Sequence, residues 1–481
     1  MVQQIMDSIN GMLWSNVFIA LALFSGLYYS IRTKGAQFRY IGLMTKYMRE
    51  KNDSGEGRTA FQSFALTMST RVGTGNIAGV ASAISIGGPG AVFWMWVSSL
   101  LGAGTTIVEC TLSQIYKSSE ENEYRGGAQY FIDKGLGIKW YAMLFAVCSV
   151  FALGFCTPGI QANAISDAMN VAFGTNKIII GVIVAIMTAM IVFGGIKRIS
   201  KFAEMIAPIM ALIYLSVAII MLIINVKEIP SILSLIFSSA FGLRSAFGGI
   251  VGNAVMMGIK RGIYSNEAGM GTAAQAAATA EVSHPVKSGL VQALSDYIDS
   301  VFLCLATAII IILTGMYNVE GIVENLPGVQ AGPGYVQNAI DTLIPGFGSA
   351  FVALAMLFFA FTTILGNYYA AETGVSYICG KVKSMNQKYL VNVLRMITII
   401  AILIFCSKPS VFAWALADLG MGVMSWLNLI ALLLLSNTAI KVFNDFEKQY
   451  KENGDAIFEP EKLGIKNAEV WEKSKVSNVN K

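Results

Sequence analysis

The residues with most chemical potential form two short polar, glycine-rich stretches inside long apolar segments. Gly73-Thr74-Gly75-Asn76 lies near the middle of one segment, and residues 265–271 (SNEAGMG) lie deep in another. Glycine weakens a helix, and any backbone group released by a break needs a partner at that depth. Free N–H groups suit a carboxylate, and free carbonyl groups suit Na⁺. The chemistry that these stretches offer is ligand binding at two broken helices.

Catalytic chemistry finds little support elsewhere in the chain. His284 is the only histidine, and the six cysteines all fall in apolar runs without metal-type spacing. Buried cysteine usually behaves as a small hydrophobe. We therefore expect no enzyme, no cofactor and no metal ion other than Na⁺.

The composition decides which elements can position the two stretches. Of 481 residues, 55% are hydrophobic and 13% are charged, whereas a soluble domain is about a quarter charged. The long apolar runs exclude a β-barrel, whose strands alternate. A net charge of only +5 gives no reason to expect a nucleic-acid partner. The sequence predicts an all-α, multi-pass protein whose surroundings are the lipid bilayer of the plasma membrane.

Eleven apolar segments are long enough to be spans. The N-terminal residues lack the positive region of a cleaved signal, so we expect the first span to be retained. Lys and Arg gather in the connections after spans 1, 3, 5 and 9 and in the tail, which predicts an extracellular N-terminus and a cytoplasmic C-terminus. The expected spans are 12–31, 60–85, 91–116, 139–173, 178–196, 202–225, 247–281, 286–315, 348–379, 389–406 and 410–440.

The two interruptions occupy matching positions in the span order. Spans 2–6 and 7–11 form two sets of five, and each set begins with an interrupted span. Because five is odd, the two sets insert with opposite topology, as in the inverted repeats of many secondary transporters. The alternative is that small residues only let helices pack closely. The predicted parts are 1–59 (extra helix and cytoplasmic segment), 60–225 (first repeat), 226–440 (second repeat, with an extracellular loop at 317–347) and 441–481 (tail).

The stretch from Gly87 to Gly102 (GGPGAVFWMWVSSLLG) resembles the signature of the sodium:alanine symporter family. Further family landmarks are residues 73–77, Gln161-Ala-Asn163, 265–271, His284-Pro285, Ile298-Asp299 and 361–366. The resemblance runs from the first span to the last. It implies a LeuT-like fold of ten core helices behind one extra N-terminal helix. It also implies Na⁺-driven symport of alanine or glycine, with D-alanine accepted by some members.

One position departs from the family pattern. Members that handle alanine often carry Trp after the motif at 362–366, where this chain has Asn367. Asparagine enlarges a pocket and adds an amide donor and acceptor. This departure raises a Na⁺- or H⁺-coupled glutamine symporter as the alternative, unless neighbouring side chains fill the space.

The expected substrate site begins with the backbone N–H groups of Gly73, Thr74 and Gly75, because helix N-termini favour anions. Gln161 and Asn163 are two residues apart and cannot share a helix face. We expect Gln161 to face the substrate and Asn163 a neighbouring helix. The other expected substrate residues are Asn76, Asn266, Gly269, Thr363 and Asn367.

The expected sodium site lies between spans 2 and 9. By resemblance, Thr362 and Thr363 contribute to it with the carbonyls of Ser69 and Val72, and Asn76 adds an amide oxygen. The alternative is that the threonines hydrogen-bond to their own helix. Asp299 is either a cation ligand or half of a buried ion pair, because a lone intramembrane carboxylate is costly.

Three further expectations concern charged residues. Arg71 and Glu109 form either a gate pair or a static ion pair. Asp299 or Glu267 would carry the proton if the coupling ion is H⁺. The polar tail after 441 is expected to be a solvated helix or a disordered extension without a function of its own.

Overall fold

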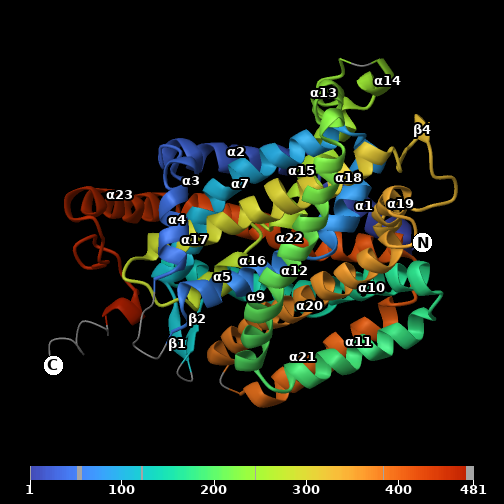
Figure 1. The fold of residues 1–481 in the computed structure, drawn as a ribbon. Coiled ribbons are helices and arrows are strands. Elements are labelled where there is room, and N and C mark those ends of the chain that lie inside the picture. The colour runs from blue at the N-terminus through green and yellow to red at the C-terminus, as the bar shows by residue number, and fades with distance from the viewer. Residues whose placement is uncertain (1, 51–56, 121–122, 244, 383, 473–481) are drawn as a thin grey trace.

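A computed structural model describes residues 2–50, 57–120, 123–243, 245–382 and 384–472. Long helices run side by side in one bundle (Figure 1). Two short antiparallel hairpins lie at its ends, β1 (Ser118–Glu120) with β2 (Glu123–Arg125), and β3 (Asn318–Val319) with β4 (Val323–Glu324). The predicted all-α membrane architecture is confirmed apart from these hairpins.

Four helices precede the first interrupted span: α1 (Val2–Leu13), α2 (Asn16–Arg32), α3 (Ala36–Arg39) and α4 (Ile41–Met48). The predicted start of the first span at Met12 was too late. Asn10 of α1 and Trp14, which follows α1, donate to the main-chain carbonyls of Ala415 and Asp418, at 2.7 and 2.9 Å. Helix α1 is therefore held against α22 through one face, on which Met6 and Asn10 are buried, while most of its other residues are exposed.

The next segments carry the first interruption. They are α5 (Ala60–Arg71), a π-helical turn (Gly75–Gly79) and α6 (Val80–Gly87); α7 (Gly90–Ile115); α8 (Ala128–Phe131) with a π-helical turn (Ile132–Leu136); α9 (Lys139–Phe151), a π-helical turn (Ala152–Cys156) and α10 (Thr157–Phe173); α11 (Lys177–Val192); and α12 (Ile196–Ile224).

The following segments carry the second interruption. They are a 3₁₀ turn (Val226–Glu228), α13 (Ile229–Ala240) and α14 (Ser245–Gly248); α15 (Val251–Asn266) and α16 (Thr272–Ala278); α17 (Pro285–Asp296), a π-helical turn (Tyr297–Cys304) and α18 (Leu305–Thr314); α19 (Pro333–Leu343); α20 (Gly348–Lys381); α21 (Gln387–Phe405); α22 (Ser410–Leu434); and α23 (Ser436–Asn453).

Both predicted interruptions are present. A Thr59–Gln62 capping box starts α5, which ends where Val72 leaves the helical region at φ −77° and ψ 89°. The second break turns through Glu267, Gly269 and Gly271, with φ of 54°, 78° and 96°. Glycine adopts this left-handed backbone readily, whereas Glu267 adopts it at a cost.

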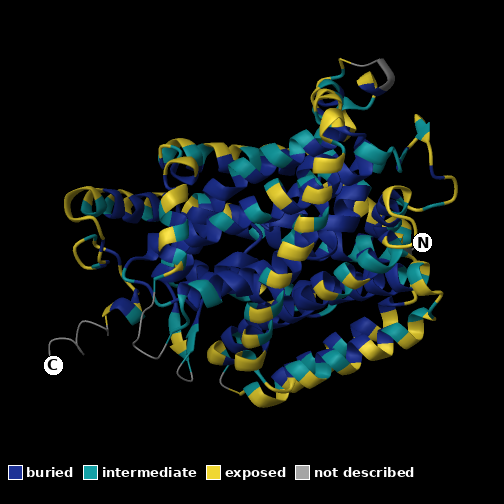
Figure 2. Cartoon of the chain, viewed as in Figure 1, coloured by how far each residue is buried: buried dark blue, intermediate teal, exposed yellow. Residues whose placement is uncertain are grey.

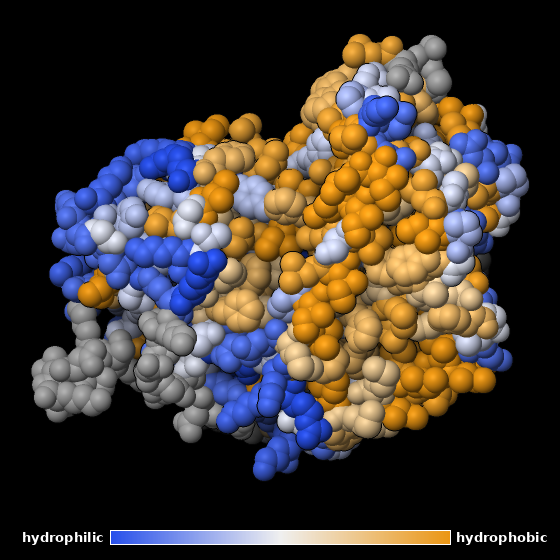
Figure 3. All heavy atoms as spheres, in the orientation of Figure 1, coloured by the Kyte–Doolittle hydropathy of each residue, from blue (hydrophilic) through white to orange (hydrophobic). Residues whose placement is uncertain are grey.

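The outer surface fits a membrane. Within the described residues, eight helices are long and apolar enough to cross a membrane by length and composition, and α11 is a shorter apolar helix. The two interrupted segments complete the expected set, although α15–α16 carries three charged residues. Figure 2 shows exposed residues along α11 and α12, and Figure 3 shows an apolar band over α12 between polar ends. Exposed side chains there include Ile179, Ile186, Ile209, Leu212 and Ile223.

The two ends of the bundle differ. We call the end with α3, α4, the β1–β2 hairpin and α23 the basic face, and the end with α13, α19 and the β3–β4 hairpin the opposite face (Figure 1). The basic face carries most of the connections that are rich in Lys and Arg.

The tail prediction was wrong for residues 455–472. Trp471 donates from its indole to the carbonyl of Gln114 at 2.9 Å, and the Phe458 N–H donates to Ser283 at 3.0 Å. Phe458 and Trp471 are 4% and 9% exposed. Burial of these two aromatic rings docks the segment on the basic face, a contact that its polar composition concealed.

Candidate functional site

The two interruptions face each other in the core. A Cβ built on Gly75 would lie 3.0 Å from the Cα of Ser265. Asp299 joins them, because Asn76 donates to its Oδ1 at 2.6 Å and the Ser265 hydroxyl donates to its Oδ2 at 2.9 Å. Ser300 donates to Oδ2 at 2.8 Å. These donors are neutral, so Asp299 is held by both interrupted spans and not as half of an ion pair with a basic side chain.

At the first break, side-chain amide oxygens accept hydrogen bonds from two backbone N–H groups. The N–H of Gly73 donates to Asn76 Oδ1 at 2.9 Å, and the N–H of Thr74 donates to Gln161 Oε1 at 3.0 Å. The Thr74 hydroxyl is buried and has no hydrogen-bond partner among the described residues. A carboxylate oxygen is the same kind of acceptor as these amide oxygens, so this arrangement can accept an anion by exchange.

The two polar residues of α10 point in different directions, as their spacing predicts. Gln161 contacts the first break. Asn163 donates instead to the carbonyls of Phe405 and Lys408 at the end of α21, at 2.9 and 2.7 Å.

Helix α20 reaches the first break through Thr363. Its hydroxyl lies 3.1 Å from the carbonyl of Val72 and 3.0 Å from that of Phe359. The Val72 carbonyl belongs to the C-terminal end of α5, where the helix dipole favours a cation. Hard cations take oxygen ligands, so this carbonyl and hydroxyl suit Na⁺.

The structure does not bring Thr362 to that point. Its hydroxyl bonds to Phe359 at 3.0 Å and lies 4.0 Å from the sulfur of Met210 on α12. Neighbouring residues on a helix point about 100° apart, so one of two adjacent threonines must turn away. The Ser69 hydroxyl also bonds within its own helix, to Leu66, and packs beside Gly366.

Asn367 lies one turn from Thr363 on α20 and faces Thr157, which lies one turn from Gln161 on α10. The Asn367 amide donates to the Thr157 hydroxyl at 3.0 Å. Its Oδ1 atom is buried and has no partner among the described residues. Asn367 is therefore near the site, with its donor used and its acceptor available.

Asn266 and Gly269 were expected at the substrate site, but both turn toward α7. The Asn266 oxygen accepts the N–H of Ala268 at 3.0 Å, and the Gly269 N–H donates to Glu109 at 3.2 Å. Ser265 takes the place opposite the first break. Ser265 is the first residue of the motif at 265–271. The sequence did not identify it, because the exact end of α15 determines which residue of the motif faces the first break.

The expected pair of Arg71 and Glu109 is also replaced. Arg71 pairs with Asp296 at 2.9 Å, with both side chains fully buried. Glu109 accepts from Asn428 at 2.8 Å as well as from Gly269. Asp296 lies one helical turn before Asp299, so the two carboxyl groups share a helix face. This spacing was the sequence signal that could have identified Asp296 as a partner for Arg71.

Carboxyl groups outnumber Arg71 around the breaks. Glu267 accepts from Thr70 of α5 at 2.8 Å and from Thr272 of α16 at 2.7 Å, which links the two interrupted spans. The buried carboxyl groups are Glu109, Glu267, Asp296 and Asp299, each 3% exposed or less. Unpaired carboxylates in a membrane interior are costly, so this group calls for a cation or protons.

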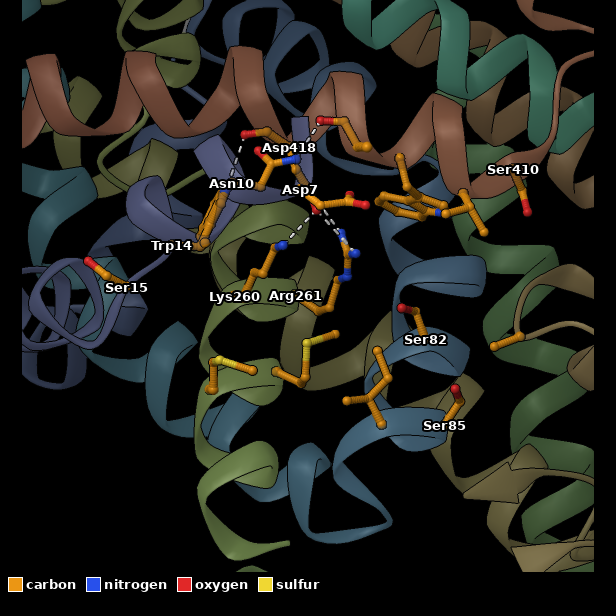
Figure 4. Close-up of a pocket in the computed structure, with 18 of the residues that line it drawn as sticks. Asp7, Asn10, Trp14, Ser15, Ser82, Ser85, Lys260, Arg261, Ser410 and Asp418 are labelled. Atoms are coloured by element: carbon orange, nitrogen blue, oxygen red, sulfur yellow. Dashed lines mark hydrogen bonds and ion pairs between the residues drawn. The ribbon is translucent and has the colours of Figure 1, made fainter. Parts of the chain in front are cut away.

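A cavity of about 820 Å³ opens on the opposite face (Figure 4). Lys260 and Arg261 reach from α15 to Asp418 on α22, at 2.7 and 2.9 Å. Arg261 also lies 4.1 Å from the ring centre of Trp414, which packs against Tyr264. Lys260 and Arg261 thus connect the second interrupted span to α22 beside this cavity.

The sequence is similar to a known protein family and to several individual transport proteins. The sequence model of the family described as "Sodium:alanine symporter family" matches residues 1–460. The chain is 49% identical over 471 residues to the "Putative sodium/proton-dependent alanine carrier protein YrbD" of Bacillus subtilis, covering 97% of each protein. It is 39% identical over 477 residues to the "Probable sodium/glutamine symporter GlnT" of Bacillus subtilis, covering 98% of this chain and 97% of that protein.

A solved structure supports the fold. The manganese transporter of Eremococcus coleocola matches with a TM-score of 0.51 at 14% identity, covering 90% of this chain and 93% of that one. At this identity the likeness concerns the fold alone, and it agrees with the LeuT-like arrangement expected from the sequence.

Proposed function

The chain belongs to the sodium:alanine symporter family, and from this premise we propose that it carries alanine or glycine into the cell together with Na⁺. It is a multi-pass membrane transporter and not an enzyme. In the proposed orientation the basic face is cytoplasmic, and the cavity beside Asp418 opens to the outside. The positive-inside rule supports this assignment.

The observation that carries the proposal is the meeting of both interruptions at Asp299, in a core where carboxyl groups outnumber Arg71. A bound cation would relieve this charge. We place Na⁺ beside the Val72 carbonyl and the Thr363 hydroxyl, with Asp299 and the amide of Asn76 as neighbouring polar groups. The proposal leaves out Thr362, because its hydroxyl faces α12.

The substrate carboxylate would bind the N–H groups of Gly73, Thr74 and Gly75. It would replace the amide oxygens of Asn76 and Gln161, which accept two of these N–H groups in the structure. Space at this point is small, because a Cβ on Gly73 would lie 2.4 Å from the Thr363 hydroxyl. This crowding favours a substrate with a small side chain, and the proposal includes D-alanine beside the L-form.

Binding of Na⁺ at the end of α5 would fix the first break and so order the N–H groups for the carboxylate. Each ligand then shifts the conformational equilibrium that the other needs, which is the physical content of coupling. Transport follows if the cavity side closes and the basic face opens around the loaded site.

Glutamine is the alternative substrate. The buried Oδ1 of Asn367 has no partner among the described residues, and a glutamine side-chain amide could donate to it. The relative GlnT bears the name of a probable sodium/glutamine symporter. The Asn367 donor is already engaged by Thr157, which limits the room for a longer side chain.

Proton coupling is the second alternative. Glu267 bridges α5 and α16 through Thr70 and Thr272, so a change in its charge would act on both interrupted spans at once. The relative YrbD is described as sodium/proton-dependent.

The test is uptake of labelled alanine by proteoliposomes at a clamped membrane potential, with Na⁺ or with choline outside. We expect uptake to require Na⁺ and glycine to compete. Uptake that is unchanged in choline would refute Na⁺ coupling, and a pH gradient then tests H⁺. Glutamine that competes better than glycine in the wild type, but not in Asn367→Trp, would favour the alternative substrate.

A further inference from the structure

Two buried glutamines near the basic face lack hydrogen-bond partners. Gln129 on α8 and Gln275 on α16 are both 0% exposed, and neither the nitrogen nor the oxygen of either amide has a partner among the described residues. A Cβ built on Gly127 would lie 2.6 Å from Gln275 Cγ and 3.1 Å from Gln129 Oε1. Both side chains therefore border the same space.

An unpaired buried amide is unfavourable by about 1–3 kcal/mol for each polar group, and proteins normally satisfy such groups with ordered water. In two nearby glutamines of equal burial the amide nitrogen has a partner, although the amide oxygen has none among the described residues. Gln114 donates to the carbonyls of Ala277 and Ala280, and Gln292 donates to Ser63. Gln129 and Gln275 have no partner within the described part of the chain at either end of the amide, so both side chains call for water or a polar solute.

Gln275 lies on a polar stripe that leads out of the site. Thr272, Gln275 and Thr279 follow a spacing of three and four residues, which places them on one face of the α16 segment and its end. Thr272 begins at the second break, where it bonds to Glu267. Thr279 lines a cavity of about 630 Å³ on the basic face. The stripe therefore connects the break with that cavity.

A buried ion pair lies next to the stripe. Arg125 at the end of β2 is 3.6 Å from Glu372 on α20, and the two side chains are 6% and 11% exposed. The backbone between Arg125 and Gln129 is pressed against α16, because a Cβ on Gly126 would lie 2.5 Å from the Cβ of Ala278. The pair thus fastens the loop that covers Gln275 to α20.

We infer that this face of α16 is the route by which the amino acid and its cation leave toward the basic face, with Gln129 and Gln275 as polar walls and Arg125–Glu372 as the closure. The inference rests on the proposed function. An amide offers both a donor and an acceptor, so two glutamines can replace water around either end of a zwitterion and around a cation. The ion pair must separate before this route opens.

The experiment measures labelling of single introduced cysteines by a membrane-impermeant thiol reagent, above the background of the six native cysteines. Gln275→Cys lies on the stripe. Ala277→Cys is the matched control, because Ala277 lies in the same helix and packs against Cys110. In membrane vesicles that expose the basic face, we expect Gln275→Cys to be labelled severalfold faster than Ala277→Cys.

A second arm tests the closure. Arg125→Ala should raise the labelling rate of Gln275→Cys severalfold. Asp133→Ala should not, although Asp133 also pairs with a residue of α20, Lys381. If Gln275→Cys does not reach the membrane, Gln129→Cys replaces it.

Equal labelling of Gln275→Cys and Ala277→Cys, in variants that still transport, would overturn the exit route. An Arg125→Ala effect no larger than that of Asp133→Ala would overturn the closure. Labelling does not depend on which solute is carried. The expected labelling of Gln275→Cys, together with wild-type vesicles that show no Na⁺-dependent uptake, would therefore refute the proposed function and leave the route standing.

Discussion

Adjacent threonines on α20 provide the sharpest test of the proposed sodium site. Thr363→Val removes the hydroxyl that lies 3.1 Å from the Val72 carbonyl, whereas Thr362→Val removes one that faces Met210. Both hydroxyls also bond to the same carbonyl, that of Phe359. The two variants therefore lose the same intrahelical bond, and they differ only in what else the hydroxyl touches.

A polar contact with a charged group contributes about 1.5–3 kcal/mol. Since about 1.4 kcal/mol corresponds to a tenfold change, Thr363→Val should raise the Na⁺ concentration for half-maximal uptake by roughly 10- to 100-fold. Thr362→Val should shift it by less than about threefold, because its hydroxyl makes only neutral contacts.

The assay is the Na⁺ dependence of labelled alanine uptake in proteoliposomes at saturating alanine, with the amount of reconstituted protein measured for each variant. Thermal unfolding of the purified variants in detergent checks that both are folded to the same degree. A shift for Thr362→Val that equals or exceeds the shift for Thr363→Val would refute the placement of the cation beside Val72.

Three further outcomes are expected. Gly73→Ala should abolish uptake, because its Cβ would lie 2.4 Å from the Thr363 hydroxyl and 3.0 Å from Gln161 Oε1; Gly252→Ala, where a Cβ meets nothing within 4 Å, is the control that should transport normally. Asp418→Asn should lower the free energy of unfolding of the purified protein by about 3–5 kcal/mol, since it leaves Lys260 and Arg261 without their carboxylate. Asp167→Asn is the control, because Asp167 also pairs with a lysine, Lys177, but is more exposed than Asp418; it should cost under about 1 kcal/mol. Equal losses in the two variants would contradict this reasoning. His284 packs against Phe458 of the tail, with the ring centres 5.5 Å apart. Burial lowers the pKa of His284 although Asp445 opposes the shift, so the docked tail favours neutral histidine. The stability of docking is therefore lost as the pH falls below the ordinary histidine pKa of about 6.5. The tail should then become easier to cleave with protease between about pH 7.5 and 5.5, and a pH step that persists in His284→Gln would assign it to another group.

The parts that sequence could predict are those governed by local physics. Glycine and polar residues inside apolar runs located both interruptions, because neither residue type suits a helix in lipid. Helical spacing also separated Gln161 from Asn163. These inferences need only the chain's own periodicity.

The parts that sequence missed depend on tertiary packing. The exact end of α15 turned Ser265 toward the first break and Asn266 toward α7. Arg71 had several buried carboxylates within the same core, and only the packing of α17 chose Asp296 over Glu109. In the tail, Trp471 follows only a few scattered apolar residues, such as Ile465, Ala468 and Val470, so its contact with Gln114 left no periodic signal.

The pairing of α1 with α22 has a consequence for biosynthesis. Asn10 and Trp14 donate to carbonyls of α22, and Trp426 of α22 donates to Leu13 at 2.8 Å. The ribosome makes the first of these partners about four hundred residues before the last. Until α22 emerges, the polar groups of the first helix lack the partners that they have in the finished protein, and a truncated chain would leave them unpaired. The hydrogen bonds of the first helix are thus complete only after the last span has been made.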